Sequence, residues 1–404
     1  MSRVALILAL VLGFTAVGGA VRAEEPQVNR AVAKTLKAAN DALQAKNFTE
    51  VLAKTKEAEA ISPRTAYDDY IIHSMQMAAY GAQSNYAETA KAIESIIDSS
   101  YLAAASKPQL LRTLMSIDYQ NKEYDKAIQY GQRALAAGDL SNDTPLTVAQ
   151  AYYLSGKFKE ALAGMEAIVA RDEQAGRKPP ERSLELIWNC AVKTKDEAAA
   201  SRAVEKLILH YPKPDYWANA MKEILQTRTS DDRLLLLTFR LMAQVGILKK
   251  GEDFTEMAQI ALDQGNPGEA QAVLEQAFAK NLYADPHEKE RTQRLLEKVK
   301  RSAAADRATI DASEKAAAAS ASGDGLVQVG AAYLGFGQPD KALASISAGI
   351  AKGNLKYSDE AYMLLGIANE RSKNKADAVR AFNRATNDPK YTRLAKLWAL
   401  EARS

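Results

Sequence analysis

The sequence has a single cysteine, three histidines and three tryptophans in 404 residues. The lone cysteine, Cys190, excludes an internal disulfide, and we interpret it as a small buried side chain beside Trp188 in a helix. The histidines, His73, His210 and His287, lie far apart and have no metal-ligand partner at helical spacing. No metal site is therefore predicted.

An excess of charge of one sign is also absent, because 53 basic residues face 50 acidic ones, a formal net charge of +3. This balance argues against a nucleic-acid or anionic-membrane partner. Nucleophile motifs, phosphate-binding loops and cysteine pairs are absent too, so neither a cofactor nor an enzymatic activity is predicted. Two acidic pairs occur, Asp68-Asp69 and Asp231-Asp232. The two carboxylates within a pair cannot face each other on a helix, because they are adjacent in sequence, and we interpret both pairs as helix caps.

Long apolar runs are missing except at the N-terminus. Arg3 precedes a short apolar run, Val4 to Phe14, and Val21-Arg22-Ala23 supplies small residues at the end. This pattern predicts a secretion signal over residues 1–23, cleaved after Ala23, because the run is shorter than the ~20 residues that span a bilayer. A secreted chain without disulfides suggests a bacterial periplasm, so we expect a periplasmic protein with no stable membrane span.

What the sequence contains instead is a recurring helical hairpin pattern. Its clearest copy, Pro108 to Ser141, has two amphipathic stretches joined by a turn at residues 121–124. Small residues at Ala127, Gly131 and Ala134 allow the two helices to approach closely. Neither helix can bury its apolar face alone, so the hairpin is expected to stack against others of its kind.

The same pattern recurs at a spacing of about 34 residues, which predicts an all-α solenoid of about ten hairpins. Repeats six and eight match weakly, and the eighth is alanine-rich. We expect repeats one to seven over 24–285, a degenerate alanine-rich hairpin over 286–322, and two sharp repeats over 323–404. A capping helix follows these two repeats within the same range. Its water-facing side is expected to carry Arg393, Lys396, Glu401 and Arg403.

These repeats resemble the tetratricopeptide repeat (TPR) family, whose pattern is matched by Leu365-Gly366, Tyr124, Ala127, Ala134, Phe382 and Ala385. The resemblance covers nearly all of the chain after the signal and implies a right-handed superhelix. The C-terminal half, with Gly265 to Ala270 and Lys352-Gly353, looks like a subgroup of periplasmic repeat proteins of Gram-negative bacteria. Some members of that subgroup are associated with TonB-type systems.

The resemblance also implies a concave groove lined by the first helix of each repeat. Amide, tyrosine and arginine side chains there suit an extended peptide, and Arg112 or Arg182 could hold a carboxylate. The alternative is a merely solvated polar face, and the residues do not reproduce the carboxylate clamp of chaperone-binding relatives. Carried over repeat by repeat, the groove positions are Asn40, Arg112, Ser116, Tyr119, Gln120, Gln150, Tyr153, Arg182, Glu185 and Asn189.

The predicted function is a non-catalytic periplasmic scaffold that holds a protein or peptide and assists or regulates an envelope complex. One alternative is a polysaccharide-acting enzyme on a helical-hairpin toroid, although three scattered tryptophans are few for sugar binding. Another is self-association as a homodimer. The run Leu234 to Leu237 in repeat six is either a buried helix or the surface for a second copy.

Overall fold

The computed structural model describes residues 26–226 and 231–404, and within these ranges the chain is all α-helical, without strands. The expected fold class is confirmed. The signal over residues 1–23 and its cleavage site lie outside the described residues. None of the described helices combines the length and apolar character needed to cross a membrane.

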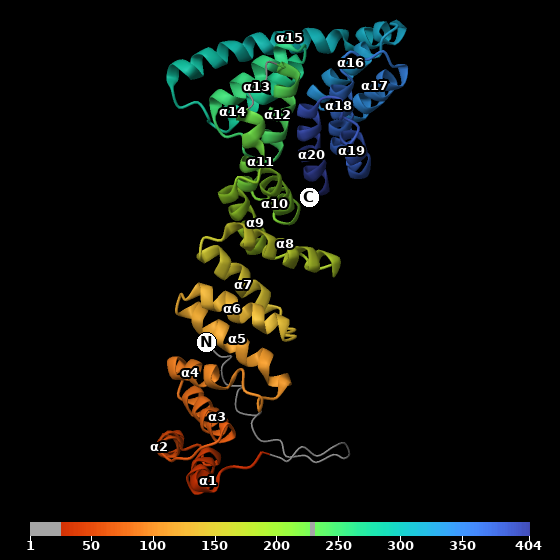
Figure 1. Cartoon of the computed structure of the whole chain (residues 1–404). Helices are drawn as coiled ribbons and strands as arrows, with labels where there is room; N and C mark the ends of the chain where they lie inside the picture. Colours follow the sequence, from red (N-terminus) through yellow and green to blue (C-terminus); the bar gives the residue numbers. More distant parts are fainter. Residues whose placement is uncertain (1–25, 227–230) are drawn as a thin grey trace. The chain divides into compact units, whose positions relative to one another are not determined.

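The chain forms two compact bodies, and the division falls inside one helix, α9 (Glu181–Thr194). The N-terminal body comprises residues 26–179 with 189–196, and the C-terminal body comprises 180–188 with 197–404. The N-terminal body holds four hairpins and a short 3₁₀ turn at residues 104–106 (Figure 1). Their helices are α1 (Arg30–Gln44), α2 (Phe48–Glu59), α3 (Ala66–Ala82), α4 (Tyr86–Ile96), α5 (Lys107–Gln120), α6 (Tyr124–Ala136), α7 (Asp143–Leu154) and α8 (Phe158–Gln174).

The C-terminal body continues the hairpins and ends with a single helix. Its helices after α9 are α10 (Glu197–His210), α11 (Pro214–Gln226), α12 (Asp232–Gln244), α13 (Gly251–Asp263), α14 (Pro267–Ala279), α15 (Pro286–Ala319), α16 (Asp324–Gly335), α17 (Pro339–Lys352), α18 (Ser358–Arg371), α19 (Lys375–Phe382) and α20 (Pro389–Arg403).

One backbone turn joins the two helices of most hairpins. In the third hairpin, Lys122 takes a positive φ of 65°, and the Glu123 N–H donates to the Asp118 carbonyl at 2.8 Å. The same bond pattern recurs in the other hairpins, with glycine at the positive-φ position in three of them, Gly156, Gly265 and Gly337. This arrangement satisfies carbonyls left unpaired at a helix end and reverses the chain.

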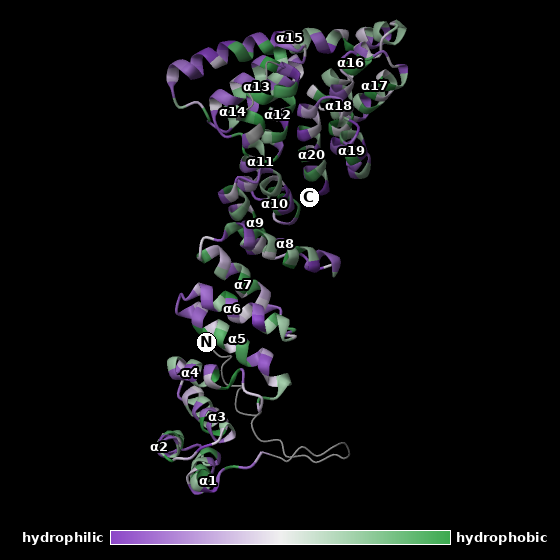
Figure 2. Cartoon of the chain, viewed as in Figure 1, coloured by the Kyte–Doolittle hydropathy of each residue, from purple (hydrophilic) through white to green (hydrophobic). Residues whose placement is uncertain are grey.

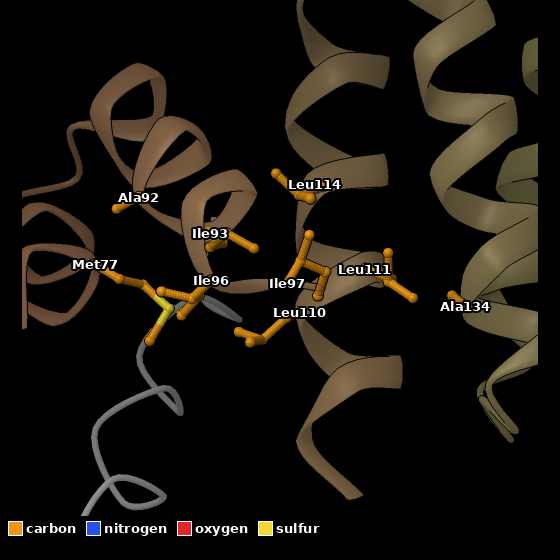
Figure 3. Packing of buried hydrophobic residues seen from close by; sticks show 9 residues of the cluster. All are labelled: Met77, Ala92, Ile93, Ile96, Ile97, Leu110, Leu111, Leu114 and Ala134. Carbon is orange, nitrogen blue, oxygen red and sulfur yellow. The ribbon is translucent and has the colours of Figure 1, made fainter. Parts of the chain in front are cut away.

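Apolar residues from successive hairpins form the core. Figure 3 shows side chains of α3, α4, α5 and α6 converging, so that the second hairpin packs on the third. Every described member is nearly inaccessible to water, as expected for an array in which each hairpin completes its neighbour's core. The cluster consists of Met77, Ala92, Ile93, Ile96, Ile97, Leu110, Leu111, Leu114 and Ala134.

The close approach predicted at Gly131 is confirmed. A Cβ built there would collide with the Val148 side chain and lie 2.9 Å from the Met115 sulfur.

We expect Gly131→Ala to lower the free energy of unfolding by about 1–3 kcal/mol, because the added methyl overpacks the interface. Gly81→Ala is the matched control, since nothing lies within 4 Å of a Cβ in that helix. Urea denaturation should show it slightly stabilised, by about 0.5–1 kcal/mol; equal destabilisation of both variants would contradict the packing argument.

The degenerate hairpin expected over 286–322 is wrong, because α15 is one continuous helix of 34 residues. Between Val299 and Ala316 the sequence offers no glycine, proline or asparagine to turn the chain, and its alanines favour helix. The first half of α15 is mostly purple in Figure 2, in keeping with its charged sequence. The helix packs on α14 at one end and on α16 at the other.

The C-terminal body closes on itself. Helix α20 packs against α19 and also against α10, α11 and α12, which lie far earlier in the chain. Figure 1 shows α20 lying between α12 and the α18–α19 hairpin. The Trp398 indole N–H donates to the Leu237 carbonyl at 3.3 Å, and its ring stacks on Phe382 at 5.5 Å. We call this contact of α12 with α18 and α20 the closing seam.

The expected water-facing side of the last helix holds for Lys396 and Arg403, which are exposed, whereas Arg393 and Glu401 are partly buried. Arg393 and Lys396 both pair with Glu205 of α10, at 2.6 and 2.7 Å. Glu401 accepts a hydrogen bond from Gln244 at the end of α12. These contacts join two parts of one body, because the array returns to its own earlier helices.

A half-buried carboxyl in the seam should make stability depend on pH. Glu360 lies 3.2 Å from Arg233, and burial nevertheless raises the pKa of Glu360 to about 7. Between the ordinary value of 4.5 and about 7, the folded state holds a proton that the unfolded state lacks. The proton on Glu360 therefore favours the folded state at low pH. As pH rises through this window, the free energy of unfolding should fall by about 1–3 kcal/mol.

Urea denaturation of wild type and Glu360→Gln over pH 5 to 8 measures this contribution as the difference between the two stability curves. The glutamine variant cannot titrate at this position, so its stability should fall less steeply as pH rises. Parallel curves would show that Glu360 is ionised to the same extent in both states.

Candidate functional site

The first helices of the N-terminal body form the surface on which the groove was predicted. In this body α1 contacts α3, and α5 contacts α7, so the first helices of hairpins one and two, and of hairpins three and four, are neighbours. Each also packs on its own second helix, and this contact buries its apolar side. The predicted groove residues of the first, third and fourth hairpins lie on α1, α5 and α7, where their side chains are partly or fully accessible to water.

Two of the predicted residues meet across adjacent helices. The Tyr119 hydroxyl on α5 donates to the Gln150 side-chain carbonyl on α7 at 3.4 Å. The Tyr119 ring also meets Tyr124 edge-on, with ring centres 5.9 Å apart. Gln120, the next residue on α5, is exposed. The aromatic ring of Tyr119, the side-chain amide of Gln150 and the exposed Gln120 thus lie on one pair of adjacent helices.

Arg112, predicted to hold a ligand carboxylate, is already engaged within the chain. Its guanidinium donates to Asp139 at 2.8 Å, and the Asp139 side chain is only 5% exposed. Asp139 also accepts from the Ser141 backbone N–H at 3.2 Å and from the Thr144 hydroxyl. Arg112 therefore ties α5 to the loop before α7, and a ligand carboxylate would have to compete with a well-held partner.

The other predicted positions do not converge on one site. Ser116 donates its hydroxyl back to the Arg112 carbonyl within α5, and Tyr153 meets Phe158 edge-on at 5.5 Å. Asn40 lies on α1, half-buried. Arg182 and Asn189 are exposed on α9, but they belong to different bodies. Glu185 receives a hydrogen bond from Tyr216 at 2.7 Å, inside the C-terminal body.

A cluster of three tyrosines is not among the groove residues predicted from the sequence. Tyr67 and Tyr70 on α3 lie with ring centres 6.3 Å apart, and Tyr101 packs on them at 5.0 and 6.0 Å. Tyr101 remains 38% exposed. The three-residue spacing of Tyr67 and Tyr70 on a predicted helix was a usable signal, whereas Tyr101 comes from the loop after α4 and has no periodic relation to them.

The residues set aside as structural have the contacts expected of them. Asp68 is fully buried, closes a capping box with Thr65 and accepts from the Asn29 backbone N–H. Asp231 caps α12. Cys190 is buried, which raises the pKa of its thiol to about 11. Across the described ranges, no three His, Cys, Asp or Glu side chains are grouped so as to hold a metal ion.

The leucine run of repeat six is buried. Leu234, Leu236 and Leu237 are at most 3% exposed, and α12 is covered by α13, α18 and α20. Burial, and not an open surface for a second copy, therefore explains the apolar surplus. The cover comes from the end of the chain, which sequence periodicity could not indicate.

Comparison with known proteins gives one family match, to the tetratricopeptide repeat over residues 330–392. No curated protein matches the chain. Solved structures similar to it include a tetratricopeptide repeat protein from Parabacteroides merdae, 11% identical, covering 82% of this chain and 98% of that one, with a TM-score of 0.29.

Two further similar structures come from yeast. The TPR2AB domain of Sti1 in complex with pHSP90 is 16% identical, with coverage of 74% of this chain and 100% of that one and a TM-score of 0.25. Tom70 is 11% identical, with coverage of 88% and 84% and a TM-score of 0.25. The family match falls on the two repeats that are sharpest in sequence, and these follow hairpins of the same helix–turn–helix form. Residues 330–392 therefore match the tetratricopeptide repeat, and the rest of the described chain shares its helical-hairpin form.

Proposed function

We propose that this chain is a non-catalytic scaffold that binds an extended segment of a partner protein along the first helices of its N-terminal body. The observation that carries the proposal is the meeting of Tyr119 and Gln150 on adjacent first helices, beside the exposed Gln120. Hairpin arrays of this family suit protein–protein interaction, because a long surface sums modest contacts from several repeats.

The chemistry of this surface fits a peptide main chain. Glutamine side chains offer both donors and acceptors, and tyrosine offers large contact area with little rotamer freedom to lose. The tyrosine cluster on α3 adds a second aromatic contact in the neighbouring repeat. An extended segment crossing α3, α5 and α7 would meet aromatic and amide groups in turn.

We also propose a setting for this activity, which features of the sequence support. We infer export to the periplasm through residues 1–23, and a role in assisting or regulating an envelope complex, which the resemblance links to TonB-type systems. The positive start, the apolar run and the small residues before Glu24 support export. The chain isolated from the periplasm of its own host should accordingly begin at Glu24.

Site-specific photo-crosslinking in the producing cell tests the binding surface. A photoreactive residue at Gln120 should capture a discrete partner, whereas one at Gln129, an exposed glutamine on the second helix α6, should not. Tyr119→Ala combined with Gln150→Ala should weaken capture at position 120 by about tenfold, the effect of losing one or two interface contacts. Equal capture at both positions would contradict the proposal.

A further inference from the structure

The C-terminal body contains a cavity of about 630 Å³ that no part of the proposed binding surface uses. Its walls come from α12, α13, α14, α15, α16 and α18, so helices far apart in the chain surround one space. Figure 1 shows α15 crossing from the α13–α14 hairpin to α16. The cavity therefore exists only because the array closes on itself.

Two glycines bring the opposing walls together. A Cβ at Gly268 on α14 would collide with the ring of Phe336, and one at Gly335 would lie 2.8 Å from the Glu269 backbone nitrogen. The contact between α14 and α16 is thus close, and it presents the Phe336 ring at the cavity wall.

A buried ion pair forms one wall and leaves no net charge there. Arg240 and Glu269, whose side chains are 6% and 9% exposed, meet through two parallel hydrogen bonds, one of 2.7 Å. Each neutralises the other. The charge that a ligand would meet must therefore come from the remaining ionisable residues of the lining.

Two arginines of the lining have no carboxylate within ion-pair distance among the residues that the structure describes. Arg371, at the end of α18, donates to the Leu334 carbonyl at 3.0 Å, and its surroundings lower its pKa through desolvation. Arg307, on α15, holds its guanidinium 4.7 Å from the centre of the Phe336 ring. The remaining acid, Glu275, lies 3.8 Å from Lys300.

The lining thus contains three arginines and two glutamates, an excess of one positive charge. Around this charge lie apolar groups, Met257, Val273 and Leu334, and three glutamine side chains, Gln244, Gln271 and Gln276. A cavity of this size falls within the range of small-molecule sites, about 300–1,000 Å³. A guanidinium beside an aromatic ring suits a carboxylate carried on a planar or apolar body.

We infer that this cavity binds an organic monocarboxylate, with Arg371 and Arg307 receiving the carboxylate and Phe336 contacting the apolar body of the ligand. The acid is a free small molecule. An acidic residue of a peptide offers the same chemistry, and the test separates the two sources. The net charge of the lining, one positive charge, matches a monocarboxylate better than a phosphate dianion.

Calorimetric titration of the full chain with benzoate tests the inference, with benzamide as its neutral counterpart and inorganic phosphate as the dianion. Benzoate should bind with Kd near ~1 mM, and benzamide and phosphate at least about tenfold more weakly. Arg371→Gln and Arg307→Gln should each weaken benzoate binding by about tenfold. Arg301→Gln, an exposed arginine of the same helix outside the lining, is the matched control and should change nothing.

Arg371 also donates to a backbone carbonyl, so Arg307→Gln keeps the test valid if Arg371→Gln fails to fold. A short peptide containing Glu–Phe and its Gln–Phe counterpart form the second arm. Binding of the glutamate peptide alone, weakened in Arg307→Gln, would support the carboxylate chemistry and assign its source to a peptide. Equal binding of benzoate and benzamide, tighter binding of phosphate, or no effect of either arginine variant would overturn the inference.

Discussion

Leu236→Asp is expected to unfold the C-terminal body. Leu236 is 3% exposed on α12, where the returning C-terminal helices cover it. The substitution removes a buried leucine side chain, about 2–5 kcal/mol, and adds the cost of a carboxyl group in an apolar site. The sum approaches the whole stability of a typical domain. Circular dichroism and limited proteolysis should report lost helix and new cleavage sites within residues 197–404.

Leu235→Asp is the matched control for this experiment. Leu235 is the adjacent residue on the same helix but is partly exposed, so its replacement should cost far less. If Leu236→Asp instead halved the molecular mass with helicity unchanged, the leucine run would be the interface of a dimer, and the burial described above would be wrong.

Trp398→Ala should lower the free energy of unfolding by about 3–5 kcal/mol, the usual cost of truncating a buried aromatic. Trp398 is 2% exposed, stacks on Phe382 and donates its indole N–H to the Leu237 carbonyl. The alanine variant loses both contacts and leaves a cavity at the closing seam. Chemical denaturation measures the loss. Trp398→Phe keeps most of the stacking and should cost nearer 1 kcal/mol, the usual value of one hydrogen bond.

Hydrogen exchange locates the effect of Trp398→Ala. Because α20 contacts α10, α11 and α12, backbone amides of α12 should exchange faster in the variant, although they lie more than a hundred residues away. Faster exchange confined to α19 and α20 would show that the seam contributes little, and would contradict the closed arrangement.

The hairpins themselves could be predicted because their signals are local. Small residues such as Gly131 and turn residues such as Gly265 and Gly337 mark each repeat within about 34 residues of sequence. The helix caps at Asp68 and Asp231 were predictable for the same reason, because capping depends on residues two to three positions away.

The rest depends on contacts that periodicity does not encode. The return of α20 onto α12 joins Trp398 to Leu237, residues with no common repeat register. The engagement of Arg112 by Asp139 depends on how the loop before α7 folds back. The cavity requires Arg307, Phe336 and Arg371 from three separate segments, and no local pattern distinguishes them from surface arginines and a core phenylalanine.

The closing seam limits how many hairpins the C-terminal body can gain or lose. In the open N-terminal body, a whole hairpin could be gained or lost with only its two neighbours affected. In the C-terminal body the same change would shift α20 away from Glu205 and Leu237 and break the ring of contacts at once. We therefore expect homologous chains to vary in hairpin number before residue 180, and to keep the number after it fixed.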